Sequence, residues 1–215
     1  LAGDLEDACD AEVMLANDAN CFATSEAMDG AGAGARIVFG CILGTGCGGG
    51  ICIDRTPHAG RNGIGSELGL NPLPWPDADE QRDPMPSGAF RDGVIDAWCS
   101  GTGLAKEHAR STGDTVDAAE VFARASKGDA AAEHSVARYE SRLARSLALV
   151  VNMIDPDIIV LGGGVSKAAR IYDAIPRLWA ENPSWIAGGV CDTPVLPAVH
   201  GDDSGKRGAA WLWRS

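Results

Sequence analysis

The sequence predicts an α/β fold with a mixed sheet flanked by helices. Two apolar runs, Arg36 to Leu43 and Ile51 to Asp54, flank a glycine loop, a pattern typical of a β-hairpin. From about Gly93 onward, predicted helices and strands alternate and end with a helix. A hairpin followed by such an alternation favours a sheet with both antiparallel and parallel strands.

Three short elements are predicted before the hairpin. Leu1 to Asp10 is typical of the end of a helix, and Glu12 to Ala16 of a short apolar strand. The polar turn Asn17 to Asn20 suits a helix start, because Asx side chains cap helices. We therefore expect a helix over Cys21 to Met28 that the following glycines end.

The region after the hairpin begins with a long irregular connection and continues with helices. Thr56 to Arg91 is rich in Pro, Gly and Asp, so little regular structure is expected there. The longest predicted helix has an apolar stripe and ends at an Asp-Pro pair. The later elements are that helix at Ala130 to Ile154, strands at Asp157 to Leu161 and Thr193 to Val199, and helices at Lys167 to Glu181 and Ser204 to Trp213.

The composition excludes several partner classes. The chain has 215 residues and a net charge of −12, from 18 basic and 30 acidic residues. Nucleic acids and anionic membranes attract basic surfaces, so neither is expected as a partner. The seven cysteines form no CxxC pair, which favours buried reduced thiols over a disulfide framework. No signal-peptide core is found at the N-terminus, and we expect a cytoplasmic protein.

Five of the seven residues from Gly44 to Gly50 are glycines. This loop contains GxGxxG, but a strand follows it, whereas a dinucleotide-binding loop opens a helix. No Gly-Lys-Ser/Thr closes it, so it is not a Walker loop. Consecutive N–H groups in such a loop can converge on a phosphate, with Thr45 as a further donor. The alternative is a tight turn of glycines.

A second glycine loop and two carboxylates are further candidates. Gly162 to Gly164 lie between a strand and a helix, which suits an anion at a helix N-terminus or a plain turn. Asp18 lies at the predicted end of a strand and could act as a general base or as a simple cap. Glu67 could bind sugar hydroxyls or be a solvated loop residue, and the polar turn His200 to Gly205 could be a site or a capping turn.

Together these segments resemble the ROK family of sugar kinases. The resemblance runs along the whole chain in five collinear motifs. They are the catalytic turn at Leu15 to Asn20, the phosphate loop at Gly44 to Gly50, the sugar segment at Asn62 to Glu67, the nucleotide segment at Leu161 to Ser166, and the tail at His200 to Trp213. That tail and Asn71 to Trp75 resemble the fructokinase/mannokinase branch.

The resemblance implies an actin-like ATPase (ribonuclease H-like) fold, mostly its C-terminal lobe. Residues 1–30 would be a remnant of the N-terminal lobe that carries the catalytic turn, and residues 31–215 the C-terminal lobe. The last helix is expected to pack back toward the N-terminal remnant. A homodimer is expected.

The resemblance also implies ATP-dependent phosphorylation of the 6-hydroxyl of fructose, mannose or glucose, with Mg²⁺ on the nucleotide. Asp18 would be the base, and the implied sugar contacts are Asn17, Asn62, Glu67 and Asp96. The implied phosphate contacts are Gly44, Thr45 and Gly46, and Gly162, Gly163 and Gly164 would lie near the nucleoside. A catalytically impaired or truncated sugar- or nucleotide-binding ROK protein is the alternative.

The sequence departs from the family pattern in two places. The DxGGT segment of the family's N-terminal lobe is not found. The four zinc ligands of the family, one His and three Cys, align with Leu70, Ser87, Ala89 and Val94, so zinc is not expected. A Glu that contacts the sugar in the family is replaced by Asp96. We expect the connection from Leu70 to Asp96 to be more mobile than in relatives.

Overall fold

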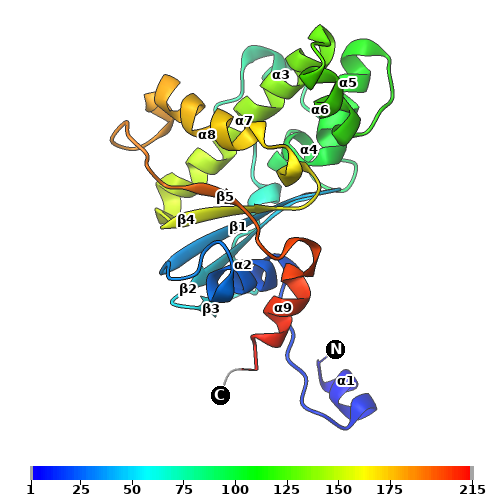
Figure 1. Ribbon diagram of the computed structural model, residues 1–215. Coiled ribbons are helices and arrows are strands. Elements are labelled where there is room, and N and C mark those ends of the chain that lie inside the picture. The colour runs from blue at the N-terminus through cyan, green and yellow to red at the C-terminus, as the bar shows by residue number, and fades with distance from the viewer. Residues whose placement is uncertain (1, 214–215) are drawn as a thin grey trace.

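Five strands form one mixed sheet in the computed structural model of the chain, which describes residues 2–213 apart from the side chain of Asp202. The strand order is β3-β2-β1-β4-β5 (Figure 1). β1 pairs antiparallel with β2 and parallel with β4, which confirms the predicted hairpin and the mixed sheet. The strands are β1 Ile37–Leu43, β2 Cys47–Ile53, β3 Thr56–Pro57, β4 Ile158–Gly162 and β5 Val195–Pro197.

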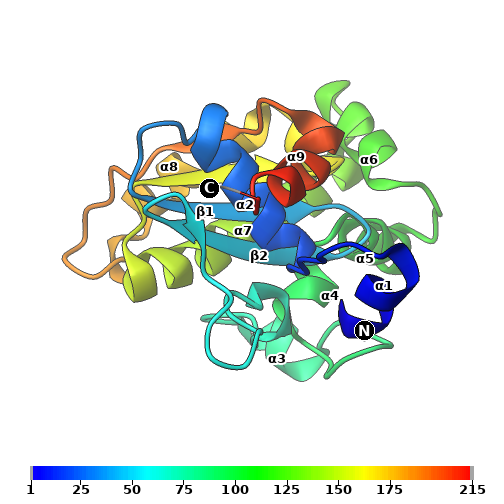
Figure 2. The same ribbon diagram turned by 90° about the horizontal axis from the view of Figure 1, so that it is seen from below.

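Helices cover both faces of this sheet. α2 and α9 lie on one face, and the helices from α4 to α8 lie on the other (Figures 1 and 2). α1 buries none of its residues and lies away from the sheet (Figure 1). The α-helices are α1 Ala2–Cys9, α2 Asp18–Asp29, α3 Ala78–Arg82, α4 Ile95–Cys99, α5 Gly101–Thr112, α6 Ala118–Ser126, α7 Ala130–Ile154, α8 Arg170–Glu181 and α9 Ser204–Ala210.

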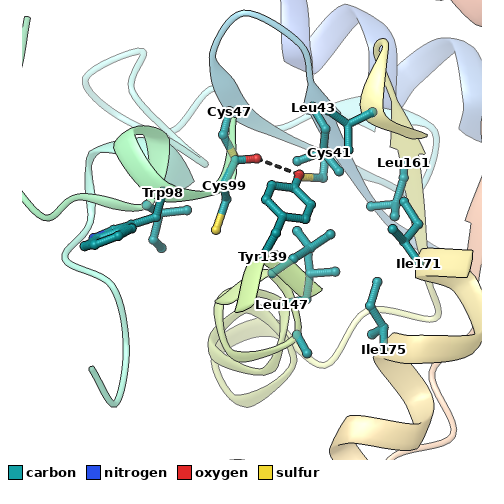
Figure 3. Close-up of a cluster of buried hydrophobic side chains, with 14 of the residues drawn as sticks. Cys41, Leu43, Cys47, Trp98, Cys99, Tyr139, Leu147, Leu161, Ile171 and Ile175 are labelled. Carbon is teal, nitrogen blue, oxygen red and sulfur yellow. Dashed lines mark hydrogen bonds between the residues drawn. The ribbon is translucent and has the colours of Figure 1, made fainter. Parts of the chain in front are cut away.

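The main core fills the space between the sheet and α7. Alternate β1 side chains, among them Cys41 and Leu43, point toward this helix because successive side chains of a strand face opposite ways. Figure 3 shows them beside Tyr139 and Leu147 of α7. The Tyr139 hydroxyl is fully buried and donates a 2.8 Å hydrogen bond to the Cys99 carbonyl, which removes the penalty of burying it.

On the opposite face, α2 lies unusually close to the sheet. A Cβ atom on Gly40 or on Gly162 would lie 2.6 Å from the ring of Phe22, and one on Gly50 would lie 2.0 Å from the Ala19 carbonyl oxygen. Only glycine therefore fits at these three positions while α2 keeps its place. The glycine richness of the chain is thus explained in part by packing.

The C-terminal segment is held to α2 by one buried carboxylate. Glu26 accepts hydrogen bonds from the Ser204 hydroxyl (2.9 Å) and from the backbone N–H groups of Val199 (3.1 Å) and His200 (3.2 Å). A Cβ on Gly208 of α9 would lie 1.7 Å from the Cys21 carbonyl oxygen, so α9 and α2 touch through their backbones. The polar turn before α9 therefore has a structural role as a joint between these helices.

Most elements agree with the sequence prediction, and α7 has the bounds expected for it. The predicted strand over Glu12 to Ala16 is wrong: this stretch pairs with no strand, and Met14 and Leu15 are 44% and 55% exposed. The glycine loop is shorter than predicted, because Cys47 to Gly50 already belong to β2. The irregular connection contains β3 and α3. How residues 1–30 divide from the rest stays a prediction.

Candidate functional site

A three-residue turn, Gly44 to Gly46, joins β1 to β2 and is fixed by hydrogen bonds on both sides. The Gly44 N–H donates to the Gly46 carbonyl at 2.9 Å, and the Gly101 N–H donates to the Gly44 carbonyl at 2.8 Å. The Cys47 N–H donates to the carboxylate of Asp96 at 2.6 Å. The turn is therefore held between the N-terminus of α5 and α4.

The N-terminus of α2 is fixed beside this turn. Asn17 caps the helix, accepting from the Ala19 N–H at 2.9 Å and the Asn20 N–H at 3.2 Å. The buried Asn20 side chain accepts from the Ile51 N–H at 3.0 Å and so ties α2 to β2. Asp18 is the first residue of the helix, and its exposed carboxylate accepts from the Ala19 N–H at 2.8 Å.

A pocket of about 310 Å³ opens between these two features, and we call it the polar pocket. Three carboxylates line it, those of Asp18, Glu67 and Asp96, together with the Gly44 to Gly46 turn. Carboxylates are acceptors for hydroxyl groups and can take a proton from one of them. The pocket therefore suits a ligand with several hydroxyl groups.

A second pocket, of about 690 Å³, lies at the N-terminal ends of α5 and α6, and we call it the helix-end pocket. Gly101 and Thr102 line it from α5, and Ala118 and Phe122 from α6. Free N–H groups and the dipole at a helix N-terminus favour phosphate. Phe122 adds an aromatic surface, so this pocket suits a ligand that has both a ring system and phosphates.

Gly44 and Thr45 line both pockets. A group bound in the helix-end pocket can therefore reach a group bound in the polar pocket across this turn. Such an arrangement brings a donor and an acceptor together, which is the main requirement of phosphoryl transfer.

The structure brings together some of the predicted site residues and separates others. Asp18, Glu67, Asp96 and the Gly44 to Gly46 turn share the polar pocket, and Gly164 lines the helix-end pocket. Neither pocket is lined by Gly162, which lies under Phe22, or by Gly163, whose φ of +83° makes the turn after β4. Asn17 and Asn62 also line neither pocket, and their predicted sugar contacts stay predictions.

Sequence reasoning missed the α5 and α6 side of the helix-end pocket. Ser100 caps α5 through the Gly103 N–H at 3.0 Å, and Asp117 caps α6 through the Glu120 N–H at 2.8 Å. Both residues are typical N-caps, so the two helix starts could have been found. The sequence could not reveal that both helix starts face one pocket, because this depends on how the helices pack.

Cys47 lines the polar pocket, but its thiol belongs to the buried core and is not an activated nucleophile. A hydrogen bond with Cys41, burial and the nearby Asp96 charge raise the pKa of Cys47 well above its usual range. A thiol in that state stays protonated and unreactive.

Among the side chains that the structure describes, no three His, Cys, Asp or Glu residues are placed to hold a metal ion. No helix of the described residues is long and apolar enough to cross a membrane.

Comparison with known proteins identifies the family. Residues 1–215 match the ROK family along their whole length. The chain belongs to the ROK family. Among its curated relatives, the N-acetyl-D-glucosamine kinases of Photobacterium profundum and Vibrio parahaemolyticus are 37% and 35% identical to it. Each alignment covers 99% of this chain and 70% of the relative.

Solved ROK structures confirm the fold. The ROK hexokinase of Thermus thermophilus superposes with a TM-score of 0.83 at 30% identity, over 98% of this chain and 67% of that one. The ROK glucokinase of Streptomyces griseus, solved with glucose and AMPPNP, gives 0.80 at 28% identity, over 99% and 71% of the two chains. The predicted actin-like ATPase fold is therefore confirmed.

These relatives support the sugar kinase class but not the predicted fructokinase/mannokinase branch in particular. The curated relatives named above are N-acetyl-D-glucosamine kinases, and the solved ones are a hexokinase and a glucokinase. The branch prediction rested on the tail and on Asn71 to Trp75. In the structure the tail contacts α2 through Glu26, which is a packing role and carries no information about the sugar.

Proposed function

We propose that this ROK protein is an ATP-dependent sugar kinase that phosphorylates the 6-hydroxyl of a hexose or hexosamine. The observation that supports it most directly is the Gly44–Thr45 segment, which lines both the polar pocket and the helix-end pocket. The sugar occupies the polar pocket and ATP the helix-end pocket, so the γ-phosphoryl group meets the sugar at this turn.

In the proposed reaction, Asp18 is the general base. Its carboxylate takes the proton of the sugar 6-hydroxyl as the oxygen of that hydroxyl forms a bond to the γ-phosphorus. The bond between the γ-phosphorus and the β–γ bridging oxygen breaks, and ADP leaves. Because Asp18 is exposed and lies on a helix that Asn20 fixes to β2, it can meet the sugar in a constant position.

The other residues bind and orient. Glu67 and Asp96 line the polar pocket and accept hydrogen bonds from sugar hydroxyls. The N–H groups of Gly44 and Gly101 are already bonded to carbonyl groups, so those of Thr45, Gly46 and Thr102 receive the phosphates. Magnesium carried on the nucleotide would neutralise phosphate charge, and Thr45, which lines both pockets, has a hydroxyl oxygen that would suit it.

The names of the relatives make N-acetyl-D-glucosamine the first sugar to test. Glucose follows, because the Streptomyces griseus relative was solved with it. Fructose and mannose, which the sequence alone favoured, complete the panel.

The test is a coupled assay of ADP release by the purified full-length protein with each sugar. We expect turnover with at least one sugar, and Asp18→Asn should reduce kcat by roughly 10²- to 10⁴-fold, the usual contribution of a general base. Asp192→Asn is the matched control, since this exposed aspartate lines neither pocket. No turnover with any sugar, or full activity of Asp18→Asn, would overturn the proposal. Sugar binding without turnover would favour a binding protein instead.

A further inference from the structure

A third pocket, of about 320 Å³, lies among α3, α4, α5 and α7, and we call it the arginine pocket. Three arginines line it, Arg82, Arg110 and Arg138, together with His134. Among the residues that the structure describes, none lines both this pocket and the polar or the helix-end pocket. The helices around it lie on the side of the sheet opposite α2 (Figure 1). Basic groups are thus gathered at one place in a chain whose net charge is −12.

Two of the carboxylates that line the arginine pocket lie at its exposed edge. Asp79 pairs with Arg82 and Asp83 pairs with Arg110, and the two aspartate side chains are 62% and 70% exposed. Ion pairs between such exposed groups contribute little to stability. An anionic ligand can therefore take the place of either carboxylate at little cost.

The third carboxylate, Glu107, is 13% exposed and is already engaged by another arginine. Arg142 donates to both of its oxygens, at 2.8 Å to Oε1. Arg138 Nε lies 2.9 Å from the same Oε1, but this buried nitrogen makes no hydrogen bond because the angle is unfavourable. Within the described part of the chain, the two Nη groups of Arg138 have no acceptor either. Most donors of this guanidinium group are thus free for a ligand.

Two further side chains have donors to offer. Arg110 Nη2 pairs with Asp83, but the acceptor of Arg110 Nη1 is the sulfur of Met85 at 3.5 Å. A thioether is a weak acceptor, so an anion would be a better partner for this nitrogen. The ring of His134 has no hydrogen bond or ion pair with any described residue, and its N–H can donate as well.

We propose that the arginine pocket binds a phosphate dianion, either free phosphate or the phosphate group of a small ester. Guanidinium groups match phosphate oxygens with charge-assisted hydrogen bonds, here from Arg110 of α5 and Arg138 of α7. A phosphate has three or more free oxygens for these two groups and His134, whereas a carboxylate has two. The volume lies at the lower end of the range for small-molecule sites, about 300–1,000 Å³, and so suits a ligand of this size. Because the pocket is separate from the other two, the site does not depend on the proposed kinase function.

The test is a calorimetric titration of the full-length protein with inorganic phosphate and, separately, with a hexose 6-phosphate. Ionic strength is held constant with NaCl, and a saturating non-hydrolysable ATP analogue fills the helix-end pocket. We expect binding of one phosphate group per chain at the arginine pocket. Tighter binding of inorganic phosphate would identify free phosphate as the ligand, and tighter binding of the hexose 6-phosphate would identify an ester. Binding of neither would overturn the proposal.

A first variant shows where the phosphate binds. Arg138→Gln should weaken binding roughly 10- to 100-fold, the effect of losing a charge-assisted hydrogen bond. Arg177→Gln is the matched control, because Arg177 also pairs with a carboxylate, that of Glu181, and does not line the pocket. Equal phosphate affinities of the two variants would mean that the anion binds elsewhere, and the proposal would fall.

A second variant predicts a gain of affinity, which a folding defect cannot produce. Asp83→Asn removes the carboxylate that competes for Arg110 and should tighten phosphate binding about two- to fivefold, the range expected for an exposed ion pair. Asp192→Asn makes the same change of charge at a residue outside the pocket and should leave the affinity unchanged. A weaker or unchanged affinity of Asp83→Asn would contradict the site.

Discussion

The carboxylate of Asp96 accepts a 2.6 Å hydrogen bond from the backbone N–H of Cys47, the residue that follows the glycine turn. A Cβ atom on Gly46 would lie 2.9 Å from the same oxygen, so the turn and the carboxylate are in contact. Asp96 therefore holds the turn in place in addition to lining the polar pocket. The sequence prediction gave it a sugar contact alone.

Replacing Asp96 should affect both pockets, because the turn it holds borders both. In Asp96→Ala the buried Cys47 N–H loses its acceptor, which should cost about 1–3 kcal/mol of unfolding free energy. We also expect higher KM values for ATP and for the sugar. Asp96→Asn keeps an oxygen acceptor and should recover part of the stability and of the KM for ATP. Denaturant unfolding and steady-state kinetics measure the two effects, and an unchanged KM for ATP in Asp96→Ala would argue against the positioning role.

The close approach of α2 to the sheet gives a second prediction. Gly40→Ala places a methyl group 2.6 Å from the Phe22 ring, and such overpacking should destabilise the fold by about 1–3 kcal/mol. Gly48→Ala, in the neighbouring strand β2, is the matched control, because a Cβ atom there would meet nothing within 4 Å. A smaller side chain in Phe22→Leu should offset part of the loss in the double variant. Equal unfolding free energies for the two alanine variants would refute this account.

Local patterns predicted the fold well where they depend on neighbours in sequence. The apolar stripe of Ala130 to Ile154 and the two runs of the hairpin are of this kind. The strand prediction over Glu12 to Ala16 was wrong because a strand needs a neighbouring strand to pair with. A run of apolar residues does not reveal whether such a partner is present. Gly162 illustrates the same limit. No side chain larger than that of glycine fits there because of the ring of Phe22, which is far away in the sequence.

The site was predictable in part for a different reason. The resemblance assigned Asp18, Glu67 and Asp96 to one sugar site, and the structure places all three in one pocket. Family motifs carry spatial information that spacing alone does not. That Leu70 and Phe90 also line the polar pocket could not be predicted. In the sequence, Leu70 stands out only as the replacement of a zinc ligand, and Phe90, an exposed aromatic residue in a loop, has no pattern that marks it.

A third prediction concerns the buried ion network between α3 and α7. Glu80 is 4% exposed and accepts from Arg142 Nε at 2.7 Å and from Arg145 at 2.9 and 3.0 Å. Arg142 also stacks on Trp98, 4.1 Å from the ring centre. This network fixes α3, in the second half of the irregular connection, to the longest helix. Removing the Glu80 charge takes from Arg145 the carboxylate with which it pairs, whereas Arg142 keeps its pair with Glu107.

We therefore expect Glu80→Gln to lower the unfolding free energy by about 3–5 kcal/mol, as for other broken buried ion pairs. Asp79→Asn is the neighbouring control. It breaks the 2.6 Å ion pair between Asp79 and Arg82, whose side chains are 62% and 76% exposed, respectively. Because the pair is exposed, its loss should change the unfolding free energy by about 0–1 kcal/mol. Denaturant unfolding distinguishes them, and a similar small loss in both would mean that the network contributes little.

The same network predicts how stability depends on pH. Burial raises the pKa of Glu80, but the hydrogen bonds from Arg145 and Arg142 lower it more, to about 2 from an ordinary 4.5. A carboxyl group with a lowered pKa in the folded state stabilises the fold fully above its unfolded pKa. That contribution should be lost as the pH falls from about 4.5 toward about 2. The difference in unfolding free energy between the wild type and Glu80→Gln should therefore be constant above pH 5 and should shrink below about pH 4.5. Urea unfolding of both proteins across this range measures it, and a constant difference down to pH 3 would contradict the low pKa of Glu80.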